Sequence, residues 1–493
     1  MTRRDLSFTG VCTGLGITFC LLVVGGCGSS PSTDNPGTGG SGAGGSSGTA
    51  GSSGTGGHGT GGGSPGTGGA TMGTAGAGAG GSGAGGSAGA GAGGRSGTGG
   101  MSGGSVGGAG GMPISSSTED TGADCPKLPA PPAFSALPSI ANLPDPFLRV
   151  DGTRITSKAD WRCRRAEIGS QIQFWGTGPK GAPPSNLTAT YSGGQLTVTV
   201  SQSGATITLT STITTPSGAG PFPLVIGMNT PTGSLPANLF PGVATMSFTS
   251  SQLVPDPLNV TRGAGTYFTM YPDRNTGAMI EWAWGVSRLI DGLYKTASQN
   301  KIDLTRIAVT GCSFQGKMAL YAGAFDERIA LTIPEESGGG GEASWRFMAT
   351  QTGTEDLEAA QGTAWYASNL LQFKNATAPK LPYDMHELVA MVAPRAIMAI
   401  ENTGIDRLGS QAGGVSMRAA TEVYKALGVP DRIGFSQAQA SAHCSFPALQ
   451  SPDVQAFVNK FLLNQTNANT AVARDSYHTD LTKWVTWATP QLQ

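Results

Sequence analysis

The chain has 493 residues, and its 30 basic and 31 acidic side chains give a formal net charge of −1. Without a basic excess it lacks the charge that binding of phosphate backbones requires, so we expect no nucleic-acid partner. Residues 31–111 are almost entirely Gly, Ser, Thr and Ala, with no Gly-X-Y register typical of collagen. Such a segment buries too little apolar surface to fold, so the sequence predicts a disordered linker over residues 28–117.

The N-terminal residues 1–27 have the pattern of an export signal. Two arginines come first, a mostly apolar run covers residues 11–24, and the segment closes on Val24-Gly25-Gly26-Cys27. Small residues before a cysteine resemble a bacterial lipobox, in which Cys27 is lipidated; a signal peptide cleaved nearby or a short membrane anchor is the alternative. We expect an exported lipoprotein at the cell surface or outer membrane, otherwise a secreted protein, that touches the membrane only through its lipid.

Residues 118–493 are expected to form one catalytic domain, because they suffice for a large core. The first strands, Leu196–Val200 and Ala205–Thr210, alternate with turns and predict an antiparallel pair. Strands then alternate with helices, which predicts an α/β sandwich whose mostly parallel sheet carries helices on both faces. The later elements expected, in chain order, are strand Phe222–Gly227, helix Gly277–Thr296, strand Arg306–Thr310, helix Gly316–Ala324, strand Arg328–Ile333, helix Met385–Val392, strand Arg395–Ile400, helix Arg418–Leu427, strand Arg432–Ser436 and helix Val454–Leu463.

A serine lies on the predicted turn between a strand and a helix, in Gly311-Cys312-Ser313-Phe314-Gln315-Gly316. A serine flanked by glycines on such a turn is typical of a nucleophile elbow, which exposes the hydroxyl and aims backbone N–H groups at a developing oxyanion. The second glycine is one place later than in G-x-S-x-G. A helix-capping serine is the alternative.

Histidine and carboxylate candidates follow the elbow. Of the four histidines, His443 follows a strand near the C-terminus, where an α/β-hydrolase places its base. The usual acid position, two strands after the elbow, offers Glu401 or Asp406, and one strand after it come Glu335 and Glu336. Spacing leaves this choice open, and general hydrolase order favours Asp406.

Four cysteines remain beyond the export segment: Cys125, Cys163, Cys312 and Cys444. An even number in an exported protein predicts two disulfide bonds, with three possible pairings. No C-x-x-C is present, so we expect no zinc site.

Several separated motifs resemble the glucuronoyl esterases, carbohydrate esterase family fifteen, over about residues 151–463. The resemblance implies an α/β-hydrolase sandwich, a Ser–His–acid triad, no metal and no cofactor. It implies hydrolysis of the ester between (4-O-methyl-)glucuronate of xylan and lignin alcohols. The motifs are Trp161-Arg-Cys-Arg-Arg-Ala-Glu-Ile168, Trp282-Ala-Trp-Gly-Val-Ser-Arg-Leu-Ile-Asp291, Val309-Thr-Gly-Cys-Ser313 with Gly316-Lys317, Ile333-Pro-Glu-Glu-Ser-Gly338 and Ala393-Pro-Arg395.

By position in the resemblance, Ser313 matches the nucleophile, His443 the base and Glu336 the acid, which leaves Asp406 as the alternative acid. The resemblance also implies the pairings Cys312–Cys444 and Cys125–Cys163. Lys317 matches a lysine that hydrogen-bonds the uronate hydroxyls.

Three departures from the family pattern concern the substrate. Phe314 stands where an arginine usually assists the oxyanion, so backbone N–H groups or another side chain such as Arg346 must serve. Arg407 stands at a sugar-stacking tryptophan. A shorter loop between Trp345 and Trp365 leaves Glu358 and Gln361 as polar candidates for substrate contact.

These observations predict a monomeric serine esterase whose partner is glucuronoxylan or a lignin–carbohydrate ester. Two alternatives stay open: an esterase for other acyl groups, such as acetyl-xylan or small-alcohol esters, and a surface glycan-binding lipoprotein with a degenerate site.

Overall fold

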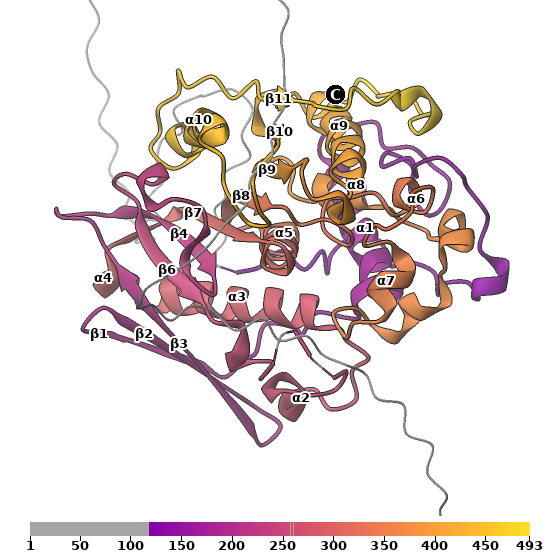
Figure 1. Ribbon diagram of the computed structural model, residues 1–493. Helices are drawn as coiled ribbons and strands as arrows, with labels where there is room; N and C mark the ends of the chain where they lie inside the picture. The colour runs from indigo at the N-terminus through magenta and orange to yellow at the C-terminus, as the bar shows by residue number, and fades with distance from the viewer. Residues whose placement is uncertain (1–117, 257, 260) are drawn as a thin grey trace, which may run out of the picture. The chain divides into compact units, whose positions relative to one another are not determined.

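The computed structural model describes residues 118–493 apart from 257 and 260 (Figure 1). The export signal, Cys27 and the linker predicted over residues 1–117 lie outside the described residues. The described part is built on a ten-stranded sheet of order β1-β2-β3-β6-β4-β7-β8-β9-β10-β11. The strands are β1 Leu187–Ser192, β2 Gln195–Gln202, β3 Ala205–Thr214, β4 Phe222–Met228, β6 Ala244–Phe248, β7 Ile302–Cys312, β8 Ile329–Glu335, β9 Ala396–Asn402, β10 Ile433–Ala438 and β11 Ala473–Arg474, with β5 Pro231–Ser234 beside β4.

The direction of the strands divides the sheet into two parts. β1, β2, β3 and β6 pair antiparallel, and from β6 through β4 to β11 every pairing is parallel. The early strands extend one edge of the sheet, as the alternating sequence pattern predicts. The predicted α/β-hydrolase sandwich is therefore confirmed.

Helices cover both faces of the sheet. One face carries α3 (Ala278–Lys295), α5 (Phe314–Phe325), α8 (Met385–Ala390) and α9 (Ser410–Ala426), with α1 (Asp160–Ile172) packed on α8. The other face carries α10 (Ser451–Phe461), which packs on β8 and β9 and lies across the sheet from α3 in Figure 1. The short helices are α2 Thr266–Met270, α4 Ala297–Asn300, α6 Trp345–Met348 and α7 Leu357–Gln361.

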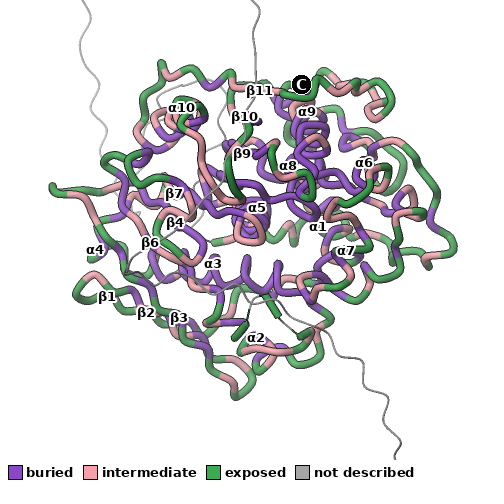
Figure 2. Tube along the Cα trace, viewed as in Figure 1, coloured by how far each residue is buried: buried purple, intermediate pink, exposed green. Residues whose placement is uncertain are grey.

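The central elements form the core. All residues of β9 are buried, and α3 buries both Trp282 and Trp284. In Figure 2 the trace of α3 is largely in the colour of buried residues. A helix that is apolar on most of its surface requires cover on every side, and α3 is covered by α5, β1 and β2. Among the described residues, no helix is long and apolar enough to cross a membrane.

Two differences from the sequence prediction have physical reasons. Helix α9 begins at Ser410, eight residues before Arg418, because its first turns use glycine for close packing: a Cβ on Gly413 would lie 2.0 Å from Glu401 Oε1. The sequence pattern does not predict helix α1, because its inward positions mix charged with apolar residues. Arg164 is buried there and pairs with Glu167 at 3.2 Å and with Glu387 at 3.0 Å.

Candidate active site

The predicted elbow forms between β7 and α5. Ser313 is the only residue between them. Its backbone angles are φ 62° and ψ −130°, a combination that residues other than glycine rarely adopt. Its N–H donates to the carbonyl of Glu335 at 2.9 Å, which holds the turn against β8. A Cβ on Gly311 would lie 2.5 Å from Gln315 O, and one on Gly316 would lie 2.4 Å from Glu335 O. Both glycines of the G-x-S-x-x-G pattern are therefore required by close backbone contacts.

His443 lies in the loop after β10 and is hydrogen-bonded to Glu336, which directly follows β8. The imidazole Nδ1 is 2.7 Å from Glu336 Oε2, and the same oxygen accepts the N–H of Cys444 at 3.0 Å. Glu336 is buried, whereas the His443 side chain is 29% exposed. Since the carboxylate oxygen accepts, Nδ1 carries the proton and Nε2 is left with a lone pair that can accept one.

Asp406, the alternative acid, begins the short turn Asp406–Leu408 after β9 and is exposed. Within the described part of the chain it forms no hydrogen bond to His443. Glu401, the other candidate two strands after the elbow, is buried and faces Glu342 instead. The geometry thus favours the carboxylate one strand after the elbow.

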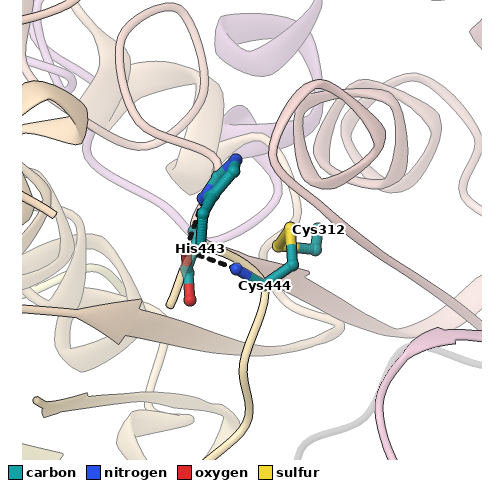
Figure 3. Close-up of side chains that lie close together, drawn as sticks. Cys312, His443 and Cys444 are labelled. Carbon is teal, nitrogen blue, oxygen red and sulfur yellow. Dashed lines mark hydrogen bonds and ion pairs between the residues drawn. A yellow bond between two sulfur atoms is a disulfide. The ribbon is translucent and has the colours of Figure 1, made fainter. Parts of the chain in front are cut away.

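A disulfide bond joins the nucleophile turn to the histidine loop. Cys312 precedes Ser313 and Cys444 follows His443, and their Cα atoms are 5.8 Å apart (Figure 3). The second disulfide, Cys125–Cys163, ties the segment before α1 to that helix. Both predicted pairings are confirmed, and two disulfide bonds are typical of an exported protein.

Four potential metal ligands gather here, because donor atoms of Cys312, Glu336, His443 and Cys444 lie within 4.8 Å of one another. The two sulfur atoms are joined in the disulfide and offer no thiolate. One imidazole and one carboxylate remain, which are fewer protein ligands than structural or catalytic zinc sites use.

Three aromatic side chains, Phe314, Trp365 and Trp282, pack together next to Ser313. The Phe314 ring stacks on Trp365 with centroids 5.7 Å apart and an interplanar angle of 22°. Its centroid lies 6.0 Å from that of the Trp282 ring. Lys317 Nζ lies 5.6 Å from the Trp365 centroid. Phe314 therefore adds apolar surface next to Ser313.

Glu355 links two of the predicted substrate residues and was missed by the sequence analysis. Its Oε2 is 3.1 Å from Lys317 Nζ, and its Oε1 forms a short ion pair with Arg407. Lys317 is buried, so its charge requires a partner. An acidic residue in the loop between Trp345 and Trp365 was the available signal, but only the folded loop brings this one to Lys317.

The other two predicted contact residues have different partners. Glu358 is exposed on α7, and the amide of Gln361 donates to Phe373 O while its oxygen accepts from Lys374 Nζ at 2.6 Å. Arg346, considered as a replacement oxyanion donor, is buried and bonded to Asp384 and to several main-chain carbonyls. Its guanidinium is therefore occupied inside the fold, and that expectation is wrong.

Buried carboxyl groups surround this site. Burial, together with the charge of Glu336, raises the pKa of Glu335 to about 7. Burial also raises the pKa values of Glu342 and Glu401, which lie side by side. Two neighbouring carboxylates in an apolar interior repel each other, which favours a protonated form of this pair.

Comparison with known proteins relates this geometry to a single group of enzymes. A family model for fungal glucuronyl esterases matches residues 198–428. A 4-O-methyl-glucuronoyl methylesterase of Hypocrea jecorina (strain QM6a) is 41% identical over 378 residues, covering 75% of this chain and 80% of that protein. The solved glucuronoyl esterase catalytic domain from Hypocrea jecorina has a TM-score of 0.69 at 40% identity and covers 74% of this chain and 100% of that chain.

A second solved structure carries a ligand. It is a serine-to-alanine mutant of the glucuronoyl esterase from Sporotrichum thermophile in complex with methyl 4-O-methyl-beta-D-glucopyranuronate. It has a TM-score of 0.68 at 35% identity and covers 72% of this chain and 97% of that chain.

Proposed function

This chain belongs to the glucuronoyl esterases, which are carboxylic ester hydrolases, and we propose that it cleaves the ester between 4-O-methyl-glucuronate of xylan and lignin alcohols through a triad of Ser313, His443 and Glu336. The observation that supports this triad is the 2.7 Å bond from His443 to Glu336, beside the strained elbow of Ser313. The Cys312–Cys444 disulfide supports it further, because it joins the neighbours of nucleophile and base.

The reaction follows from the roles of these groups. Ser313 Oγ attacks the C6 carbonyl of the uronate while His443 Nε2 takes the hydroxyl proton. The tetrahedral intermediate expels the alcohol, which receives that proton, and leaves an acyl-enzyme. His443 then activates water, which releases the uronic acid. Glu336 fixes the imidazole tautomer and stabilises the imidazolium at each step.

Stabilisation of the oxyanion rests on the backbone. Phe314 cannot donate a side-chain hydrogen bond, and Arg346 is occupied elsewhere. We assign the oxyanion donors to N–H groups at the start of α5, where the dipole of the helix also favours negative charge. Losing one oxyanion donor typically raises the barrier by about 2.7–4 kcal/mol, so we expect a slower enzyme than one with a side-chain donor.

Lys317 and Arg407 are proposed to bind the uronate, with Glu355 orienting both cations. Their ammonium and guanidinium groups suit the hydroxyl and ring oxygens of a sugar, and Glu355 can accept from its hydroxyls. Phe314 and Trp365 would cover an apolar face of the sugar or of the alcohol. Glu358 and Gln361 remain proposed outer contacts.

An esterase for other acyl groups is the second candidate, favoured by the loss of a donor at Phe314 and of a stacking ring at Arg407. A glycan-binding lipoprotein without turnover is a third. Comparing benzyl glucuronate with p-nitrophenyl acetate separates them. We expect strong preference for the glucuronate ester, lost in Ser313→Ala; preference for the acetate supports the second candidate, and binding without turnover of either supports the third.

We also propose that the protein is exported with residues 1–27 as its signal and residues 28–117 as a linker to the catalytic domain at 118–493, and that it acts as a monomer. Cys27 would carry the lipid anchor. Cys27→Ser should move the protein from the membrane fraction to the soluble fraction. Equal membrane association of both forms would contradict lipidation at this residue.

A further inference from the structure

Glu335 lies between the proposed nucleophile and the proposed acid but has no role in the steps above. It is the last residue of β8, directly before Glu336, and it is paired with Cys312 of β7. Its main-chain carbonyl accepts the N–H of Ser313 at 2.9 Å. The main chain of Glu335 therefore contacts the turn of Ser313 and continues directly into Glu336.

The side chain of Glu335 is buried at 1% exposure and only half satisfied. The hydroxyl of Ser234, at the end of β5, forms a short hydrogen bond to Oε2, whereas Oε1 has no hydrogen-bond partner among the described residues. An ionised carboxylate is costly in such a position, because no donor replaces the lost water. The negative charge of Glu336 adds repulsion, and the pKa of Glu335 is raised to about 7.

No counter-charge on the neighbouring elements is directed at Glu335. The charged side chains on β7, α5 and α10, which pack against β8, form ion pairs elsewhere: Asp303 with Arg306, Lys317 with Glu355, Asp453 with Arg474 and Lys460 with Asp431. On β9, Glu401 is an acid that faces Glu342, and burial raises its pKa. The charge that acts on Glu335 is that of Glu336, which raises its pKa.

We propose that Glu335 is a positioning residue for this reaction, whose neutral carboxyl group leaves Glu336 as the single negative charge beside His443. The proposal rests on the triad assigned above. When Glu335 loses its proton, the second negative charge favours the imidazolium form of His443. Since the imidazolium cannot act as a base, part of the enzyme stays inactive at a pH where the base would otherwise be free.

The consequence is a defined change in the pH profile. Two coupled groups titrate together, so the acid limb of the wild-type profile is broadened and displaced to higher pH. Glu335→Gln keeps the shape of the side chain and removes its titration. We expect the acid limb of this variant to follow the titration of a single group. Its midpoint should lie below that of the wild type by on the order of one pH unit, which is the shift that a buried neighbouring charge produces.

The experiment is the pH dependence of kcat/KM for benzyl glucuronate, from about pH 5 to about pH 9. Glu281→Gln is the matched control, because Glu281 is likewise buried with one hydroxyl partner, Thr276, but lies on α3 and does not adjoin Glu336 in the chain. The control should change stability and leave the midpoint unmoved. An unshifted midpoint in Glu335→Gln, or the same shift in the control, overturns the proposal.

A second variant tests the proposal if Glu335→Gln does not fold. The hydrogen bond from Ser234 lowers the pKa of Glu335, so Ser234→Ala should keep Glu335 neutral to higher pH and move the midpoint in the same direction. No movement in Ser234→Ala would count against the role of Glu335. Failure of the triad itself has another signature, which is activity retained by Ser313→Ala.

Discussion

The Cys312–Cys444 disulfide is expected to support both stability and turnover, and the second disulfide provides a control. The chain-entropy model relates stabilisation to the length of the closed loop. A separation of 132 residues gives about 5 kcal/mol for Cys312–Cys444, and a separation of 38 gives about 4 kcal/mol for Cys125–Cys163. Removing either bond should therefore lower stability by similar amounts.

Activity should distinguish the two bonds. Cys312 and Cys444 adjoin the proposed nucleophile and base, so the double variant Cys312→Ala/Cys444→Ala frees the two loops to move apart. A misplacement of about 1 Å can lower the rate about 100-fold. Cys125→Ala/Cys163→Ala loosens only the segment before α1, and its kcat should stay close to that of the wild type.

The assay measures urea unfolding by tryptophan fluorescence and kcat with benzyl glucuronate on each double variant, at a temperature where both remain folded. Comparable losses of stability with loss of kcat in the first variant alone would support the reasoning. Equal kcat in the two variants would refute it, because the bond would then act only on the unfolded chain.

Three further predictions concern single carboxylates. Glu336→Ala should lower kcat by about 10⁴-fold with little change in KM, whereas Asp406→Ala should act mainly on KM; the reverse ranking in steady-state kinetics would restore Asp406 as the acid. Glu355→Gln should raise KM for the glucuronate ester, because two cations lose their shared partner, and an unchanged KM in steady-state kinetics would contradict this role. Burial raises the pKa of Glu281 from 4.5 to about 8, so this group binds a proton in the folded state that the unfolded state releases; stability should fall by about 3 kcal/mol between about pH 4.5 and about pH 7, and urea midpoints of Glu281→Gln should lack this part of the decline.

The sequence predicted the strands, most of the helices and the elbow, because each of these features depends on local constraints. Gly311 and Gly316 mark the elbow, since the turn brings the backbone too close for any Cβ. The acid was open by spacing alone, because Glu336 and Asp406 both follow parallel strands and only the folded histidine loop selects between them. The family resemblance supplied Glu336 and the two disulfide pairings.

Long-range contacts explain what the sequence did not reveal. Glu355 meets Lys317 and Arg407 only after the loop between α6 and α7 has folded, and no periodic pattern marks it. The buried pair of Glu342 and Glu401 likewise joins a glycine-rich loop to β9. Sequence analysis assigns lone carboxylates to the solvent by default, so buried pairs of this kind escape it.

The backbone conformation at the proposed triad lowers the stability of the fold, and this has a consequence for protein engineering. Ser313, Glu336 and Cys444, which follows His443, all have positive φ values, of 62°, 46° and 61°. Each such residue typically destabilises a fold by about 1–2 kcal/mol relative to glycine. Cys444 is held in its disulfide bond, which stabilises the fold by more than glycine would, so a library selected for heat resistance alone should accumulate glycine at Ser313 and Glu336 and lose turnover. The most thermostable descendants of this chain would be poor esterases, and selection must couple survival of heat to hydrolysis in every round.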